Sequence, residues 1–171
     1  MRTTLLLIGI GICISLHAQP AANEVVEKAF QQARQENKKV FLIFHASWCK
    51  PCHLMDSAMN DAKCKTMFTD HYVVAHLDVM DKKPLENPGA NELLKRYDPK
   101  GQGGVPVWVI LDKEGALLAD SFMKPGQNTG CPSKKEEVAY FIQVLKKTSA
   151  LSDTDLALIQ TRFEQTDQKA H

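Results

Sequence analysis

The sequence predicts an α/β fold in which helices flank a central mixed sheet, with an extra helix at the C-terminal end. Apolar residues make up 44% of the 171-residue chain and charged residues 24%, as in an ordinary globular domain with one core. Short β-rich apolar runs alternate with segments of helical spacing, which is typical of a layered α/β sheet. A turn rich in polar residues separates the last two predicted strands, so we expect them to be antiparallel.

The first half of the chain begins with helical spacing of apolar residues over 23–37, with Asn23 as a possible cap. Residues 40–44 form a short apolar run that predicts a buried strand. Helical spacing returns over 51–59 and again over 62–68. Residues 72–79 predict the next strand.

The second half alternates in the same way. Its predicted elements are a helix at 90–97, a strand at 105–111, a partner strand at 116–122, a helix at 133–148 and an amphipathic helix from 152. Ser133 and Glu136 form a capping box for the predicted helix at 133–148. The last helix contains Leu156, Ile159 and Phe163 at core spacing. Residues 124–132, rich in Gly, Pro and Asn, predict a loop.

Residues 1–18 have the pattern of a secretory signal peptide. Arg2 precedes an apolar run over 5–16, and cleavage is expected after Ala18. An uncleaved N-terminal anchor is the alternative, although a spanning helix needs about 20 apolar residues. We therefore expect a periplasmic or extracellular protein with no membrane span in the mature chain. Its parts are a domain over 19–150 and a C-terminal helix with a polar tail over 151–171.

Charge and cysteine content narrow the function. The formal net charge is +1 and no long charged block occurs, so charge gives no indication of nucleic acid as a partner. Cys13 lies in the predicted signal peptide, and the other four cysteines are too sparse for a disulfide scaffold. Because export places them in an oxidising compartment, a chemical role for the close pair Cys49 and Cys52 is favoured.

The segment from Cys49 to Cys52 follows a predicted strand and opens a predicted helix. A helix N-terminus stabilises a thiolate, and the positive charge of Lys50 adds to this effect. Pro51 suits the first turn, where its missing N–H costs nothing. We expect Cys49 to be the exposed nucleophile and Cys52 to be the shielded thiol that resolves the mixed disulfide.

Three other interpretations of this segment remain. A zinc site needs further ligands, and Cys64 and Cys131 are isolated in the sequence. The letters from Cys49 to His53 match the C-x-x-C-H pattern for haem attachment, but the apolar sheet pattern leaves no haem crevice. A purely structural disulfide would close only a very short loop. We expect no cofactor and no metal.

The stretch from Phe44 to His53 resembles the active-site signature of the thioredoxin superfamily, with Trp48 before the first cysteine and Pro51 before the second. Further on, Val105 and Pro106 resemble the cis-proline loop of that family. The resemblance covers 24–148 and implies a thioredoxin fold. It also implies that this loop faces the dithiol and binds the backbone of a substrate, and an X–Pro bond tolerates the cis form.

Some positions depart from the family pattern. Ile43 occupies the place of a buried Asp, and His76 falls where its usual Lys partner lies, so His76 is a candidate substitute. The continuation after Cys52 is similar to that of small periplasmic thiol:disulfide interchange proteins. We expect Cys131 to lie near the dithiol and Cys64 to be a small buried residue.

The resemblance implies a thiol–disulfide oxidoreductase that acts on protein disulfides in the cell envelope. Cys49 and Cys52 would be catalytic, and the supporting residues would be Trp48, Lys50, Pro51, Val105 and Pro106. A reductase is favoured, while a binding module with a non-catalytic disulfide is the alternative. The expected partners are protein thiols and disulfides and an envelope electron donor or acceptor, with the chain as a monomer. We predict that Cys49 and Cys52 form the only intramolecular disulfide.

Overall fold

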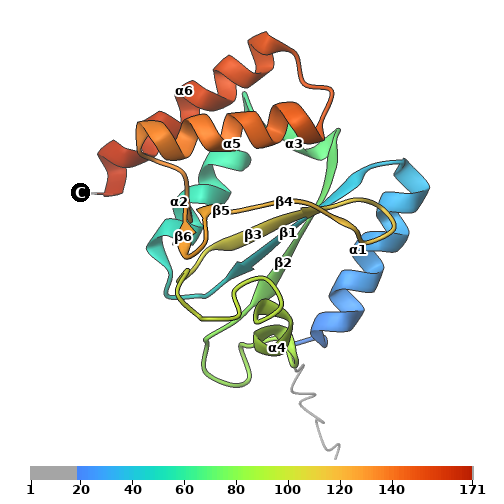
Figure 1. Cartoon of the computed structure of the whole chain (residues 1–171). Coiled ribbons are helices and arrows are strands. Elements are labelled where there is room, and N and C mark those ends of the chain that lie inside the picture. Colours follow the sequence, from blue (N-terminus) through green and yellow to red (C-terminus); the bar gives the residue numbers. More distant parts are fainter. Residues whose placement is uncertain (1–18, 171) are drawn as a thin grey trace, which may run out of the picture.

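A four-stranded mixed sheet forms the centre of the molecule. The computed structural model describes residues 19–170, so the predicted signal peptide lies outside the described residues. The sheet order is β2-β1-β3-β4 (Figure 1). β1 (Lys39–His45) is parallel to β2 (Tyr72–Asp78) and antiparallel to β3 (Val107–Leu111), and β3 is antiparallel to β4 (Leu117–Asp120). The predicted mixed sheet is confirmed.

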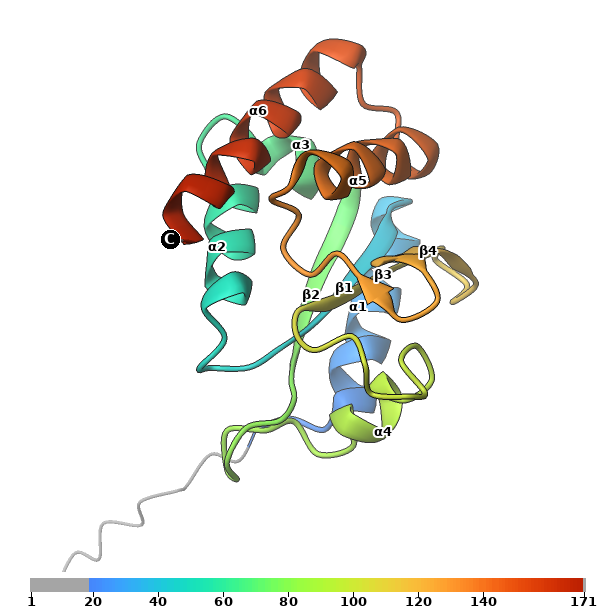
Figure 2. The ribbon, with the colours of Figure 1, turned by 60° about the vertical axis from the view of Figure 1, so that its left-hand side comes forward.

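Helices cover both faces of this sheet (Figures 1 and 2). One face carries α1 (Ala22–Glu36) and α4 (Ala90–Leu94). The other face carries α2 (Lys50–Met59), α3 (Lys65–Thr69), α5 (Lys135–Thr148) and α6 (Asp153–Ala170). Because successive side chains of a strand point to opposite faces, β1 must be apolar on both sides. That requirement explains the unbroken apolar run that predicted it.

Several local predictions are wrong. The predicted strand over 116–122 ends at Asp120, and a second hairpin follows, made of β5 (Phe122–Lys124) and β6 (Gln127–Asn128). It occupies part of the predicted loop. Asn23 lies inside α1, whose N-cap is Ala21. The cap of α5 is shifted by one residue, because the Glu137 carboxylate accepts the backbone N–H groups of Ser133 and Lys134.

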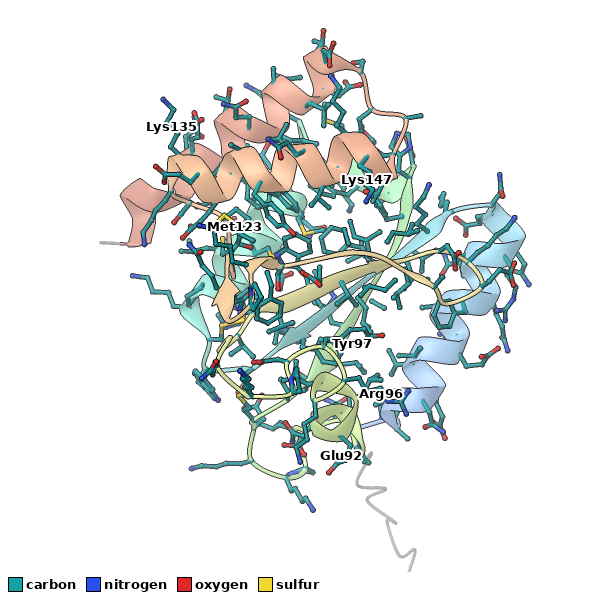
Figure 3. All side chains as sticks on the ribbon, in the orientation of Figure 1. Glu92, Arg96, Tyr97, Met123, Lys135 and Lys147 are labelled. Carbon is teal, nitrogen blue, oxygen red and sulfur yellow. A yellow bond between two sulfur atoms is a disulfide. The ribbon has the colours of Figure 1, made fainter. Side chains whose placement is uncertain are left out.

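The core between the sheet and α5 is aromatic, and α6 is part of it. Trp108, Phe141 and Phe163 are fully buried, and the ring centroids of Phe141 and Phe163 lie 4.8 Å apart. Leu156 and Ile159 are buried as predicted. Exposed lysines lie on the solvent side of α5 (Lys135 and Lys147, labelled in Figure 3). None of the described helices is long and apolar enough to cross a membrane.

Replacing Phe163 by Ala tests whether α6 is part of the core. The loss of a buried ring against Phe141 should lower the free energy of unfolding by about 3–5 kcal/mol. Leu158 lies on the same helix and is 42% exposed, so Leu158→Ala should change the free energy of unfolding by no more than about 0.5 kcal/mol. Urea denaturation measures both values. Equal, small effects would show that α6 contributes little to the fold.

Candidate functional site

A disulfide joins Cys49 and Cys52 where β1 leads into α2. The two Cα atoms are 5.3 Å apart, and Cys49 is the N-cap of α2. Its Sγ accepts the backbone N–H of Cys52 at 3.1 Å, and Pro51 lies in the first turn, where its missing N–H costs nothing. The predicted pairing is confirmed, and Cys64 and Cys131 are free thiols in the described part of the chain. The helix N-terminus therefore directs its partial positive charge at the sulfurs.

Both sulfurs are covered. Cys49 is 2% exposed and Cys52 is 1% exposed, so the prediction of an exposed Cys49 is wrong for this oxidised form. The reason is the segment before β3: Sγ of Cys49 lies 3.4 Å from the carbonyl oxygen of Val105, and the Val105–Pro106 peptide bond is cis. The family resemblance implied that this segment faces the dithiol, and the contact of Val105 with Cys49 agrees with that expectation.

Asn128 in β6 ties the hairpin to this segment. Its Nδ2 donates hydrogen bonds to the carbonyl oxygens of Gly103 at 2.8 Å and Pro106 at 2.9 Å. Its Oδ1 accepts the N–H of Gly130, whose carbonyl oxygen accepts the indole N–H of Trp108. The hairpin thus links the core to both sides of the Val105–Pro106 bond. Sequence reasoning missed Asn128, because in the sequence it is one polar residue of an expected loop.

A shallow groove of about 250 Å³ lies beside the disulfide, between Pro51 and Pro106. Cys131 lines it, as predicted, and is 9% exposed. Burial raises the pKa of Cys131 to about 12, which keeps it a thiol at neutral pH. Cys64 is fully buried as predicted, and it lies beyond the far end of α2. Burial raises the pKa of Cys64 as well.

Residues that follow β2 hold the segment just before Cys49 in place. The side chain of Asp81 accepts the backbone N–H of Ser47 at 2.7 Å and its hydroxyl at 2.6 Å, and these bonds lower the pKa of Asp81. Trp48 is 63% exposed, and its indole N–H donates to the Met80 carbonyl oxygen at 3.1 Å. The predicted supporting residue Lys50 is the exposed first residue of α2.

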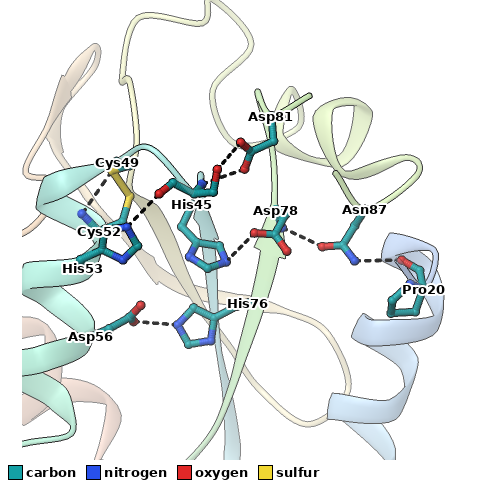
Figure 4. A network of polar contacts seen from close by, with 11 residues as sticks. Pro20, His45, Cys49, Cys52, His53, Asp56, His76, Asp78, Asp81 and Asn87 are labelled. Atoms are coloured by element: carbon teal, nitrogen blue, oxygen red, sulfur yellow. Dashed lines mark hydrogen bonds and ion pairs between the residues drawn. A yellow bond between two sulfur atoms is a disulfide. The ribbon is translucent and has the colours of Figure 1, made fainter. Parts of the chain in front are cut away.

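Two histidines and two carboxylates lie between α2 and the sheet, next to the disulfide (Figure 4). Nε2 of His76 is 2.8 Å from Oδ1 of Asp56, and Nε2 of His45 is 3.2 Å from Oδ1 of Asp78. The two imidazole rings lie 4.9 Å apart. Burial, and then the neighbouring His76, lower the pKa of His45. Ile43 is paired with His76 in the sheet and is buried. Its side chain is apolar, so it adds no polar group to this cluster.

Sequence reasoning selected His76 from this cluster but missed His45 and Asp78. Their positions at the ends of β1 and β2 were the available signal, since parallel strand ends meet at one sheet edge. The residues present do not fit a c-type haem: the two sulfurs are joined, and Nε2 of His53 bonds to the Ser47 carbonyl oxygen at 2.9 Å. Within the described residues, no three His, Cys, Asp or Glu side chains are arranged to hold a metal ion.

Comparison with known proteins supports the class of the fold. Residues 21–113 match the sequence model of a family described as thioredoxin-like, and the chain belongs to that family. A relative in Caenorhabditis elegans, the uncharacterized protein B0495.5, is 29% identical over 109 residues. The match covers 61% of this chain and 14% of the relative, so the chain spans only a small part of that protein's length.

One solved structure shows a similar fold with a TM-score above 0.5, and a second match lies just below that value. A disulphide isomerase from Xylella fastidiosa Temecula1 matches with a TM-score of 0.51 and 20% identity, over 93% of this chain and 99% of that chain. A DsbH oxidoreductase matches with a TM-score of 0.48 and 23% identity, over 85% of this chain and 95% of that chain. The first match covers nearly the whole of both chains.

Replacing Asn128 by Ala tests the link between the hairpin and the segment before β3. The carbonyl groups of Gly103 and Pro106 lose their donors, so the free energy of unfolding should fall by about 1–3 kcal/mol. Asn60 is exposed and donates one side-chain bond, so Asn60→Ala is the matched control and should cost less than about 1 kcal/mol. Denaturant titration measures the free energy of unfolding of both variants. Equal losses would contradict the role of Asn128 as the link between the hairpin and the segment before β3.

The pH dependence of stability tests the burial of His45. Its pKa lies below the ordinary value of 6.5, so above that pH the imidazole is neutral in both the folded and the unfolded chain. As the pH falls through 6.5, the unfolded chain binds a proton that the folded chain resists, and stability falls. Denaturant midpoints at about pH 7 and about pH 5.5 should therefore differ less in His45→Gln than in the wild type. Equal differences would show that His45 contributes nothing to the acid sensitivity.

Proposed function

We propose that this protein is a thiol–disulfide oxidoreductase of the cell envelope that reduces protein disulfides through Cys49 and Cys52. The observation that carries the proposal is the disulfide across the first turn of α2, with Sγ of Cys49 as the helix N-cap. Reduction of that disulfide leaves the Cys49 sulfur at the positive end of the helix dipole. A thiolate is stabilised there, and the thiolate is the nucleophile of disulfide exchange.

The reaction takes two exchange steps. The Cys49 thiolate attacks one sulfur of a substrate disulfide, so a mixed disulfide forms and the other substrate sulfur leaves as a thiolate. Cys52 then loses its proton and attacks Sγ of Cys49, which breaks the mixed disulfide and releases the second substrate sulfur. The substrate gains two electrons and two protons, and the protein ends with the Cys49–Cys52 bond found here. An external dithiol donor must reduce that bond again.

The surroundings of the disulfide support a protein substrate. The groove between Pro51 and Pro106 is open at the surface, and Trp48, next to Cys49 in the chain, has an exposed indole. An extended polypeptide in this groove would meet the backbone at Val105, next to the sulfur that reacts. The apolar, positively charged N-terminal pattern supports export, and the Trp48–Pro51 signature supports reduction over oxidation.

Single cysteine variants test the activity with insulin as substrate. Cys49→Ser removes the nucleophile, so turbidity from reduced insulin should not rise above the rate with dithiothreitol alone. Cys52→Ser keeps the nucleophile and should accumulate a mixed disulfide that survives on non-reducing gels. Cys64→Ser, at a buried thiol away from the site, should keep the wild-type rate.

The alternative, a binding module with a non-catalytic disulfide, makes the opposite prediction. Insulin reduction would then be absent in the wild type, or would be the same in Cys49→Ser. Circular dichroism of each variant separates loss of chemistry from loss of fold.

A further inference from the structure

The second exchange step needs a group that accepts the proton of the Cys52 thiol. Cys52 is 1% exposed, and a buried thiol gives up its proton reluctantly because desolvation disfavours the thiolate. Cys52 must nevertheless be deprotonated when it attacks the mixed disulfide. Ile43, on the strand beneath α2, is apolar and accepts no proton. An acceptor has to come from another residue that faces α2.

The register of the sheet places His45 level with Cys52. On α2, Asp56 lies one turn below Cys52, about 6 Å along the axis, and it binds His76. On the sheet, His76 is level with Ile43, and His45 lies two residues further along β1, about 6.6 Å nearer the start of α2. Since the two steps are about equal, the ideal spacings put His45 at about the height of Cys52 along α2. Figure 4 shows its ring between α2 and the Asp78 carboxylate.

The contact of His45 with Asp78 indicates which nitrogen carries the proton. Nε2 lies 3.2 Å from Oδ1 of Asp78, and an ionised carboxylate attracts the protonated nitrogen, so we assign the proton of the neutral ring to Nε2. Nδ1 then carries a lone pair. This atom is buried and has no hydrogen-bond partner among the described residues. A lone pair held in this way is available to accept a proton.

The other charged groups around His45 already have hydrogen-bond partners. From α2, Asp56 binds His76, and His53 binds the Ser47 carbonyl oxygen. From the segment after β2, Asp81 accepts both bonds from Ser47. Burial and the proximity of His76 lower the pKa of His45, so at neutral pH the ring is in its unprotonated, basic form.

We propose that His45, oriented by Asp78, accepts the proton of the Cys52 thiol when the mixed disulfide is resolved. The inference rests on the proposed function, because it assigns a role in the second exchange step. The proton passes from Cys52 to Nδ1 while the bond between Cys49 and Cys52 forms. The electron pair of the broken mixed disulfide leaves on the substrate sulfur. Asp78 stabilises the imidazolium, which then returns its proton to the departing thiolate or to water.

Stopped-flow reaction of the reduced protein with DTNB, an aromatic disulfide that releases a coloured thiolate, separates the two steps. The first release reports the attack of Cys49, and the second reports the attack of Cys52. In His45→Gln we expect the second phase to be at least about tenfold slower at neutral pH, with its pH profile shifted to higher pH. The first phase should stay within about twofold of the wild type, and an unchanged second phase and pH profile would overturn the proposal.

Two further variants separate a proton acceptor from a packing residue. His76→Gln alters the neighbouring ring but leaves Nδ1 of His45 in place, so the second phase should stay within about threefold of the wild type. Asp78→Asn removes the charge that orients His45, and should slow the second phase and shift its pH profile in the same direction as His45→Gln. Equal slowing in His76→Gln and His45→Gln would overturn the proposal. If His45→Gln does not fold, an unchanged second phase in Asp78→Asn overturns it.

The same experiment keeps this inference apart from the proposed function, because DTNB is not a protein substrate. A normal first phase with an unaffected second phase in the variants overturns only the role of His45. A reduced wild-type protein with no first phase overturns the proposed function, and the role of His45 with it.

Discussion

The junction between β1 and α2 is the constraint on which the rest of the structure depends. β1 lies between β2 and β3 and is buried on both faces, so the end of this strand is fixed in three dimensions. Four residues later Cys49 caps α2, and its sulfur meets both the Cys52 N–H and the Val105 carbonyl oxygen. Because both neighbours are backbone groups, the position of the sulfur pair follows from the paths of α2 and of the segment before β3.

Polar contacts on two sides keep this junction in place. Asp81 and the Met80 carbonyl oxygen hold the residues just before Cys49, and Asn128 holds the segment that faces it. Both supports come from segments outside the central sheet: the residues after β2 and the small β5–β6 hairpin. Of these two supports, the hairpin borders the groove beside the disulfide, at Asn128. Surface segments of this kind commonly carry the binding residues of a domain.

The main features were predictable from local sequence signals. The apolar run of β1, the Cys49–Cys52 spacing and the core spacing of α6 are each contained in a few consecutive residues. The contacts missed join residues far apart in the chain. His45 and Asp78 meet only because β1 and β2 pair in one register, and Asn128 reaches Pro106 only because a hairpin forms within an expected loop. The burial of Cys49 was missed although the segment before β3 was expected to face the dithiol, because no local sequence signal shows how closely the Val105 carbonyl oxygen approaches the sulfur.

The reduction potential of the Cys49–Cys52 pair, measured at equilibrium against glutathione, tests the central claim most directly. A helix-start dithiol that reduces substrate disulfides must have a low potential, because its oxidised form has to be the more stable one. The account predicts a potential near about −270 mV, as in thioredoxin. A potential near about −120 mV, typical of a strong oxidant, would contradict it.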